Sequence, residues 1–96
     1  MERTYIGLIH KEPSSDYGVS FPDFPGCITA GDTLEKARTM AAEALALHIE
    51  GMASSGLEIP KPSSADAVVA HPDACDAIAL VVVKALPEYA EIQESL

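Results

Sequence analysis

Apolar residues recur along this chain with two different periods, and the change of period separates short strands from one long helix. Between residues 34 and 52 the spacing is three and four, which places one set of positions on a single helix face. That set is Leu34, Ala37, Ala41, Ala44, Leu45, His48, Ile49 and Met52. Asp32 can cap the first turn with Glu35 reaching back to complete a capping box, and Gly56 suits the C′ position.

Three short runs before this helix are rich in the β-branched and aromatic residues that favour strands. They cover residues 3–10, 17–21 and 27–30. Because only short links separate them, we expect an antiparallel meander. In the second link Pro22 and Pro25 fix their own φ and Gly26 can adopt a positive φ, which predicts a stiff turn.

The most apolar run of the chain, residues 76–84, shows no alternation. Such a run is typical of a strand that is central or buried on both faces. Before it lie an extended, proline-containing linker at residues 57–64 and a small polar segment, which either holds a weak strand at Val68 and Val69 or wraps an edge.

A helix between the third and fourth strands allows the last strand to pair parallel to an earlier one by a crossover. The predicted class is therefore α+β with the order β-β-β-α-β. We expect a four-stranded mixed sheet with one main helix on one face.

The composition of the chain limits the number of domains, the kind of partner and the cellular compartment. The chain has 96 residues, enough for one domain, and its formal net charge of −9 repels phosphate backbones and favours basic partners. A solvated acidic surface is the simpler alternative. Cys27 and Cys75 do not make a disulfide framework, and the sequence shows neither a signal peptide nor a membrane span. We expect a cytoplasmic protein.

Residue types with catalytic potential do not form a recognisable motif, so we expect no catalytic residue, metal or cofactor. The histidines at 10, 48 and 71 are not at metal-ligand spacing with either cysteine. Cys27 is interpreted as a small buried hydrophobe, since no neighbouring base is evident, and Ser20 lacks a nucleophile-elbow pattern.

The same order of elements begins the ribonuclease H fold, whose nucleases hold two metal ions with carboxylates from the first strand, the helix and the fourth strand. Here residues 4–9 and 78–83 contain no Asp or Glu, and Asp76 only precedes the last strand. The sequence therefore predicts a protein without enzymatic activity, with a degenerate nucleic-acid enzyme as the weaker reading.

Acidic and aromatic residues gather in sequence around the central hairpin, where they suggest a docking surface for a basic protein. These candidate partner-binding residues are Asp16, Tyr17, Asp23, Phe24, Asp32 and Glu35. The alternative is a rigid turn with Phe24 folded beneath it.

Residues 17–37 resemble the signature of HicB-type antitoxins, and further similarity follows at residues 43–51 and 56–62. The resemblance runs from Tyr5 to about Val83. It implies a partial ribonuclease H fold without nuclease activity. It also implies a partner, a small basic HicA-type toxin that has a double-stranded-RNA-binding fold and cleaves mRNA through a catalytic histidine. The antitoxin would bind this toxin and block it.

On this reading residues 1–86 form the HicB-like domain, and residues 87–96 are a short tail. Many members of the family continue into a helix-turn-helix or ribbon-helix-helix domain, whereas this tail is too short for either, so we expect no direct nucleic-acid binding by this chain alone.

The leading hypothesis is an antitoxin that neutralises a toxin. Its rival is a stand-alone oligomeric binding or regulatory module without a toxin partner. A small Trp-free core and an apolar last strand further suggest a homodimer or higher homo-oligomer.

Overall fold

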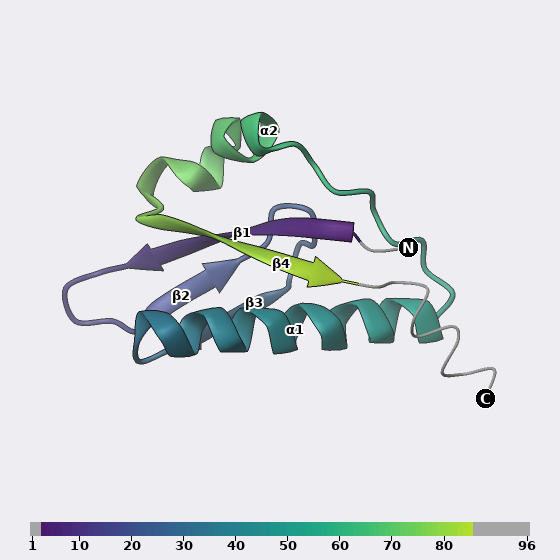
Figure 1. The fold of residues 1–96 in the computed structure, drawn as a ribbon, viewed down its shortest axis with the longest axis horizontal. Coiled ribbons are helices and arrows are strands. Elements are labelled where there is room, and N and C mark those ends of the chain that lie inside the picture. Colours follow the sequence, from purple (N-terminus) through teal and green to yellow (C-terminus); the bar gives the residue numbers. More distant parts are fainter. Residues whose placement is uncertain (1–2, 86–96) are drawn as a thin grey trace.

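In the computed structural model, which describes residues 3–85, a four-stranded sheet lies between one long helix and one short one (Figure 1). The elements in chain order are β1 (Arg3–Lys11), β2 (Tyr17–Ser20), β3 (Ile28–Gly31), α1 (Leu34–Ser54), α2 (Ala65–Ala70), the 3₁₀ helix η1 (Pro72–Asp76) and β4 (Ala79–Ala85). The strand order in the sheet is β3-β2-β1-β4. The α+β class and its main helix are confirmed, and the tail at residues 87–96 lies outside the described residues.

The pairing of β4 differs from the prediction. β4 runs antiparallel to β1, as all other paired strands do, so the expected parallel crossover and mixed sheet are wrong. The physical reason is an additional traverse of the sheet. After α1 the chain returns along its length through residues 57–64, here called the linker, and through α2, so that β4 begins near the end of the sheet where α1 begins (Figure 1).

Three side chains, two from β1 and one from the β2–β3 turn, hold the linker on this return path. The Arg3 guanidinium donates to the Pro60 carbonyl at 3.4 Å, and the Tyr5 hydroxyl donates to the same oxygen. The Asp23 carboxylate accepts from the backbone N–H of Ser63 at 2.9 Å and from its hydroxyl at 2.5 Å. All these contacts join residues far apart in sequence, so they contribute to stability only in the folded chain.

At the start of α1 the predicted N-cap residue is wrong, whereas at its end the predicted C′ glycine is confirmed. Thr33, not Asp32, is the N-cap, because its hydroxyl accepts from the Lys36 N–H at 3.0 Å. Asp32 instead lies 3.9 Å from the Lys36 ammonium group, so the predicted capping box does not form. At the other end Gly56 has φ +74°, as expected for a C′ glycine that ends a helix.

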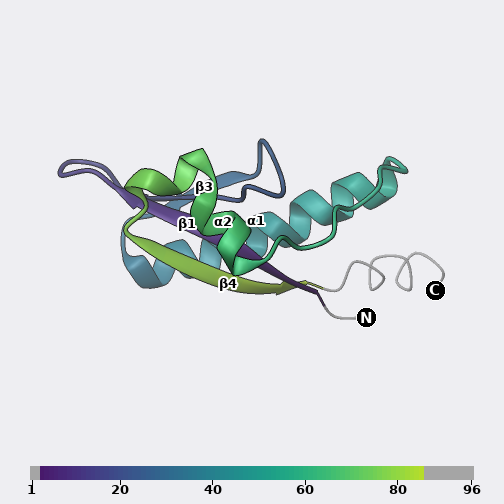
Figure 2. The ribbon, with the colours of Figure 1, turned by 90° about the horizontal axis from the view of Figure 1, so that it is seen from above.

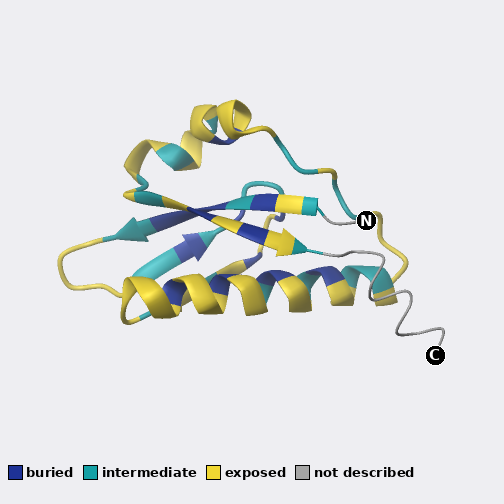
Figure 3. Cartoon of the chain, in the orientation of Figure 1, coloured by how far each residue is buried: buried dark blue, intermediate teal, exposed yellow. Residues whose placement is uncertain are grey.

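The hydrophobic core lies between α1 and the sheet. The helix buries Ala37, Ala41, Leu45 and Ile49 against Tyr5, Ile9, Val19, Phe21, Phe24, Cys27, Val81 and Val83. Small residues bring the layers close: a Cβ placed on Gly31 in β3 would lie 2.5 Å from the backbone nitrogen of Ala37. Figure 3 shows the resulting buried stripe along the sheet-facing side of α1.

The other face of the sheet is partly covered by α2 and η1, which lie opposite α1 in two views (Figures 1 and 2). Val68 is buried there, in a helix, so the strand considered at Val68 and Val69 does not form. Leu8 of β1 is buried as well, although it stands outside the α1-side core.

β4 is an edge strand, not a central one, and this corrects the interpretation of its unbroken apolar run. Its side chains alternate, with Val81 and Val83 buried under α1 while Leu80 is 41% and Val82 63% exposed.

Candidate protein-binding surface

The six residues predicted to form one docking surface divide between the two ends of the β2–β3 hairpin. Asp16 and Tyr17 lie at the start of β2, next to the end of β3, because Tyr17 pairs with Gly31. Asp32 and Glu35 follow immediately, at the start of α1. Asp23 and Phe24 belong to the turn at the opposite end, separated by four-residue strands that span about 13 Å. The expected single cluster is therefore wrong.

Phe24 is buried and is not available as a surface anchor. Its side chain is 1% exposed, and its ring meets Tyr5 at 4.8 Å and His48 at 5.7 Å, both edge-on. Two consecutive turns direct it inward, with N–H donors of Phe24 and Cys27 each 2.9 Å from their acceptor carbonyls. The structure thus has the alternative arrangement, a rigid turn with Phe24 beneath it.

The remaining candidate residues differ in how far their side chains are exposed and so accessible to a partner. Asp23 is half-buried and holds the linker. Asp16, Asp32 and Glu35 are exposed. Tyr17 is half-buried with the Lys11 ammonium group 5.6 Å from its ring centre, a cation–π contact. The exposed carboxylates form the acidic end of the hairpin, close to the N-terminus of α1.

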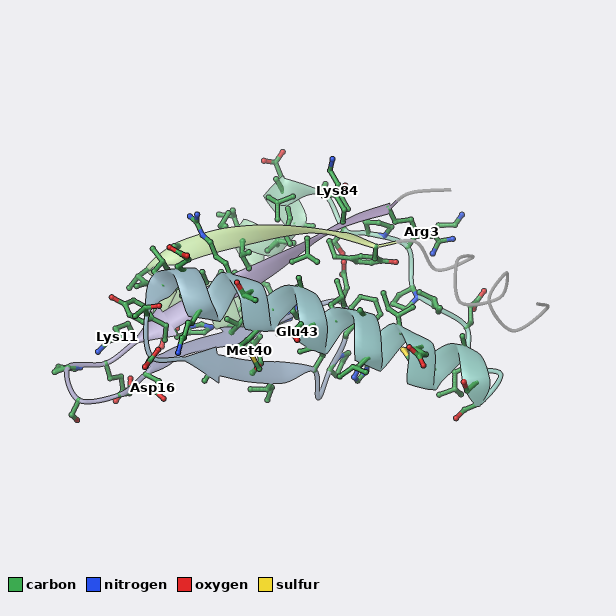
Figure 4. All side chains as sticks on the ribbon, turned by 60° about the horizontal axis from the view of Figure 1, so that its bottom comes forward. Arg3, Lys11, Asp16, Met40, Glu43 and Lys84 are labelled. Carbon is green, nitrogen blue, oxygen red and sulfur yellow. The ribbon has the colours of Figure 1, made fainter. Side chains whose placement is uncertain are left out.

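Exposed apolar side chains occur along the side of α1 that faces β3. Ile28 is 72%, Leu47 69% and Met40 39% exposed, and a shallow groove of about 320 Å³ runs between β3 and the helix, lined in part by Ile28, Leu47 and His48. Figure 4 shows Met40 on the sheet side of the helix and Glu43 on its outer face. We call Ile28, Met40 and Leu47, with the exposed carboxylate of Glu43, which lies three and four residues from Met40 and Leu47 on α1, the β3 flank.

The spacing of two large apolar residues in the sequence could have identified this flank, although the pattern of core positions did not. Met40 and Leu47 are seven residues apart, so they share one side of the helix, but they lie outside the face assigned to the core. Large apolar residues on an otherwise polar helix side favour a contact with another surface.

A serine, a histidine and a carboxylate also come together, which the sequence did not suggest. His10 Nδ1 lies 3.1 Å from Asp76 Oδ1, and His10 Nε2 lies 3.4 Å from the Ser20 hydroxyl. Hydrolases use this order of groups, but with a buried carboxylate and a nucleophile on a sharp turn. Asp76 is 77% exposed and Ser20 lies in a regular strand, so we interpret the trio as a link between η1 and the sheet.

The two cysteines have different environments. Burial raises the pKa of the Cys27 thiol, which disfavours the thiolate and hence a nucleophilic role. Cys75 is exposed. Within residues 3–85 no three His, Cys, Asp or Glu side chains are grouped to hold a metal ion, and no helix in that range is long and apolar enough to cross a membrane.

Comparison with known proteins gives consistent results at the level of sequence. The family described as "HicB_like antitoxin of bacterial toxin-antitoxin system" matches residues 5–94. An uncharacterized 14.9 kDa protein of Haemophilus phage HP1 is 46% identical over 72 residues, which cover 75% of this chain and 54% of the relative. "Antitoxin HicB 2" of Photorhabdus laumondii is 37% identical over 54 residues, covering 56% of this chain and 39% of the relative. The chain thus spans about half or less of these curated relatives.

Solved structures agree. A chain of a "HicA3 and HicB3 toxin-antitoxin complex" superposes with a TM-score of 0.69 at 29% identity, covering 83% of this chain and 94% of that one. The antitoxin HicB of Burkholderia pseudomallei gives a TM-score of 0.67 at 35% identity, with coverage of 84% and 61%. The family is one of antitoxins, not an enzyme class. By sequence and by fold, this chain belongs to the HicB-like antitoxins of bacterial toxin–antitoxin systems.

Proposed function

We propose that this chain is an antitoxin that binds and neutralises a small basic HicA-type toxin. The observation that carries the proposal is the family match over residues 5–94. The close coverage of a chain whose structure was solved in a toxin–antitoxin complex supports it, since 94% of that chain is matched. We place the activity in the cytoplasm and assign it to residues 1–86, without direct nucleic-acid binding by this chain.

The charge of the chain supports a basic partner. A formal net charge of −9 creates a field that accelerates encounter with a cationic protein and opposes binding to nucleic acid. On the described surface, Asp16, Asp32 and Glu35 are exposed together at the acidic end of the hairpin. In the proposed complex these carboxylates steer the toxin toward the sheet.

The β3 flank supplies the contacts that hold the toxin after encounter. Ile28 and Leu47 are the two most exposed large hydrophobic side chains among the described residues, and the groove beside them continues toward Ala44 and His48. Apolar side chains in the centre of an interface contribute most of its affinity, whereas charges at the rim mainly affect the association rate.

The test co-expresses the antitoxin with a HicA-type toxin encoded beside it and measures growth rescue and binding kinetics. Leu47→Lys inserts a positive charge into the apolar contact against a basic partner. Loss of about 2 kcal/mol corresponds to about 30-fold faster dissociation, and rescue should weaken accordingly. Leu57→Lys is the matched control, because Leu57 is 59% exposed but lies away from the flank, just beyond the end of α1.

Two outcomes contradict different parts of the proposal. If wild-type protein folds but neither rescues growth nor binds the neighbouring toxin, the antitoxin function is wrong. If wild type binds and Leu47→Lys binds equally well with an unchanged melting temperature, the toxin contacts another surface.

A further inference from the structure

The outer edge of β4 is uncovered within residues 3–85, the part of the chain that the structure describes. β4 pairs with β1 on one side only, so half of its backbone hydrogen-bonding groups face outward. Beside this edge a groove of about 430 Å³ runs between β4 and α1, bordered by Arg38 and the small side chain of Ala42. On the other face of the strand Leu80 and Val82 are 41% and 63% exposed. The edge thus offers apolar surface together with unpaired backbone groups.

The charge beside this edge is opposite to that of the chain as a whole. The two charged residues that line the groove, Arg38 and Lys84, are both cationic and exposed. The whole chain has only six basic residues against fifteen acidic ones. Among the described residues, no ion pair engages either of these two cations. A segment that is complementary to this edge therefore combines carboxylates with apolar side chains.

We propose that the tail of this same chain, residues 87–96, occupies the groove and covers the edge of β4. The tail has the required charge, because it contains three glutamates and no Lys or Arg; they are Glu88, Glu91 and Glu94. It also has the required apolar residues, spaced three and four apart as on one side of a helix; they are Tyr89, Ile92 and Leu96. Covering an edge strand with a helix or loop is a common way to protect a sheet from pairing with other chains.

The tail is also in the right place and long enough. Only Leu86 separates it from the end of β4 at Ala85, and Pro87 fixes its own φ, which favours a turn directly after the strand. Residues 88–96 span about 13 Å even when helical, at about 1.5 Å per residue. The part of β4 that lines the groove, from Leu80 to Lys84, has the same length of about 13 Å.

The covalent connection favours the tail over a segment of another molecule. A short connection holds the tail at an effective concentration of about millimolar beside the groove. A second copy that paired through the same edge would instead bring its own Arg38 and Lys84 toward these two cations, and a basic toxin would also meet like charge. The inference goes beyond the proposed toxin binding and does not depend on it, because the β3 flank lies at the opposite edge of the sheet.

The test follows the whole chain by nuclear magnetic resonance, without toxin, at low and at high micromolar concentration. We expect contacts between the Tyr89 or Ile92 side chain and the methyl groups of the β4 valines. We also expect protection from hydrogen exchange of those β4 amides that do not bond to β1, independent of protein concentration. Replacing Glu88, Glu91 and Glu94 together by Lys should lower this protection by about fivefold or more, because the tail then has the charge of the groove.

Reversal of the groove provides a rescue that a merely structural effect would not give. Arg38→Glu and Lys84→Glu, added to the triple Lys variant, should restore the protection of the β4 amides. Lys36→Glu is the matched control for Arg38→Glu, because Lys36 is also exposed on α1 but lies two residues away, on another side of the helix. This control should keep the wild-type protection.

Several results would overturn the proposal. One is an edge of β4 that exchanges freely at every concentration, and another is a folded triple variant with wild-type protection. Protection that grows with protein concentration would assign the edge to a second copy, and protection that appears only with added toxin would assign it to the toxin. If the triple variant does not fold, the contacts and the exchange of the wild type decide alone.

Discussion

Replacing Phe24 by alanine distinguishes a core residue from a surface anchor, and the structure gives the expected size of the effect. The side chain is 1% exposed. A phenylalanine buries roughly 150–250 Å² of apolar surface, which at about 25 cal/mol per Å² corresponds to roughly 4–6 kcal/mol, part of which alanine retains. Truncation of buried phenylalanine typically costs about 3–5 kcal/mol, and we expect this range for Phe24→Ala.

Such a loss is large for a chain of this length. At roughly 0.05–0.15 kcal/mol per residue, 96 residues give a total stability of about 5–14 kcal/mol. Phe24→Ala should therefore remove about a fifth or more of the free energy of unfolding. The edge-on contacts with Tyr5 and His48, at 4.8 and 5.7 Å, are lost together with the burial.

Equilibrium unfolding in urea, followed by far-UV circular dichroism because the chain has no Trp, measures the effect. Leu47→Ala is the control: its side chain is 69% exposed, so its loss should change stability by no more than about 0.5 kcal/mol. If Phe24→Ala keeps its native spectrum, loses less than about 1 kcal/mol and nevertheless fails to bind toxin, Phe24 is an anchor and the burial argument is refuted.

Local geometry also predicts the effects of two glycine substitutions and the behaviour of the two thiols. Gly31→Ala should destabilise the fold by about 1–3 kcal/mol in thermal or urea unfolding, because its Cβ would lie 2.5 Å from the backbone of α1. Gly51→Ala, which meets nothing within 4 Å inside the helix, should instead stabilise it by about 0.5–1 kcal/mol; a destabilised Gly51→Ala would contradict this reasoning. With a thiol reagent at neutral pH, Cys75 should react at once and Cys27 only on unfolding, since burial raises the pKa of Cys27. The stability linked to that raised pKa should fall as the pH rises above 9.0, the ordinary value, because the unfolded chain releases the proton first; equal reaction rates of both thiols in the native protein would refute the assignment.

Features determined by neighbouring residues were predictable from the sequence. Gly26, at φ +91°, and Gly56, at φ +74°, occupy the positive-φ positions that the turn and the helix end required. The helical period likewise identified the buried face of α1. The helix start was misplaced by one residue, because Asp32 and Thr33 are both good N-cap residues and only the backbone geometry decides between them.

Features determined by distant residues were not predictable. The direction of β4 depends on the return path of the linker. Arg3 and Tyr5 hold the linker by donating to the Pro60 carbonyl, and Asp23 holds it by accepting from the Ser63 N–H. These are single polar contacts between residues 40 or more positions apart, and no local sequence pattern predicts them. The predicted four-stranded α+β class was nevertheless correct, because the class depends on which helices and strands form and not on the direction of β4.

The prediction that the six candidate residues form one cluster failed for a related physical reason. Residues close in sequence were assumed to be close in space, but a hairpin places the residues before it and the residues in its turn at opposite ends. Phe24 resembled an exposed aromatic among carboxylates, whereas the flanking turns direct it into the core. The exposed apolar residues that replace it, Ile28 and Leu47, come from different elements and meet only in the fold.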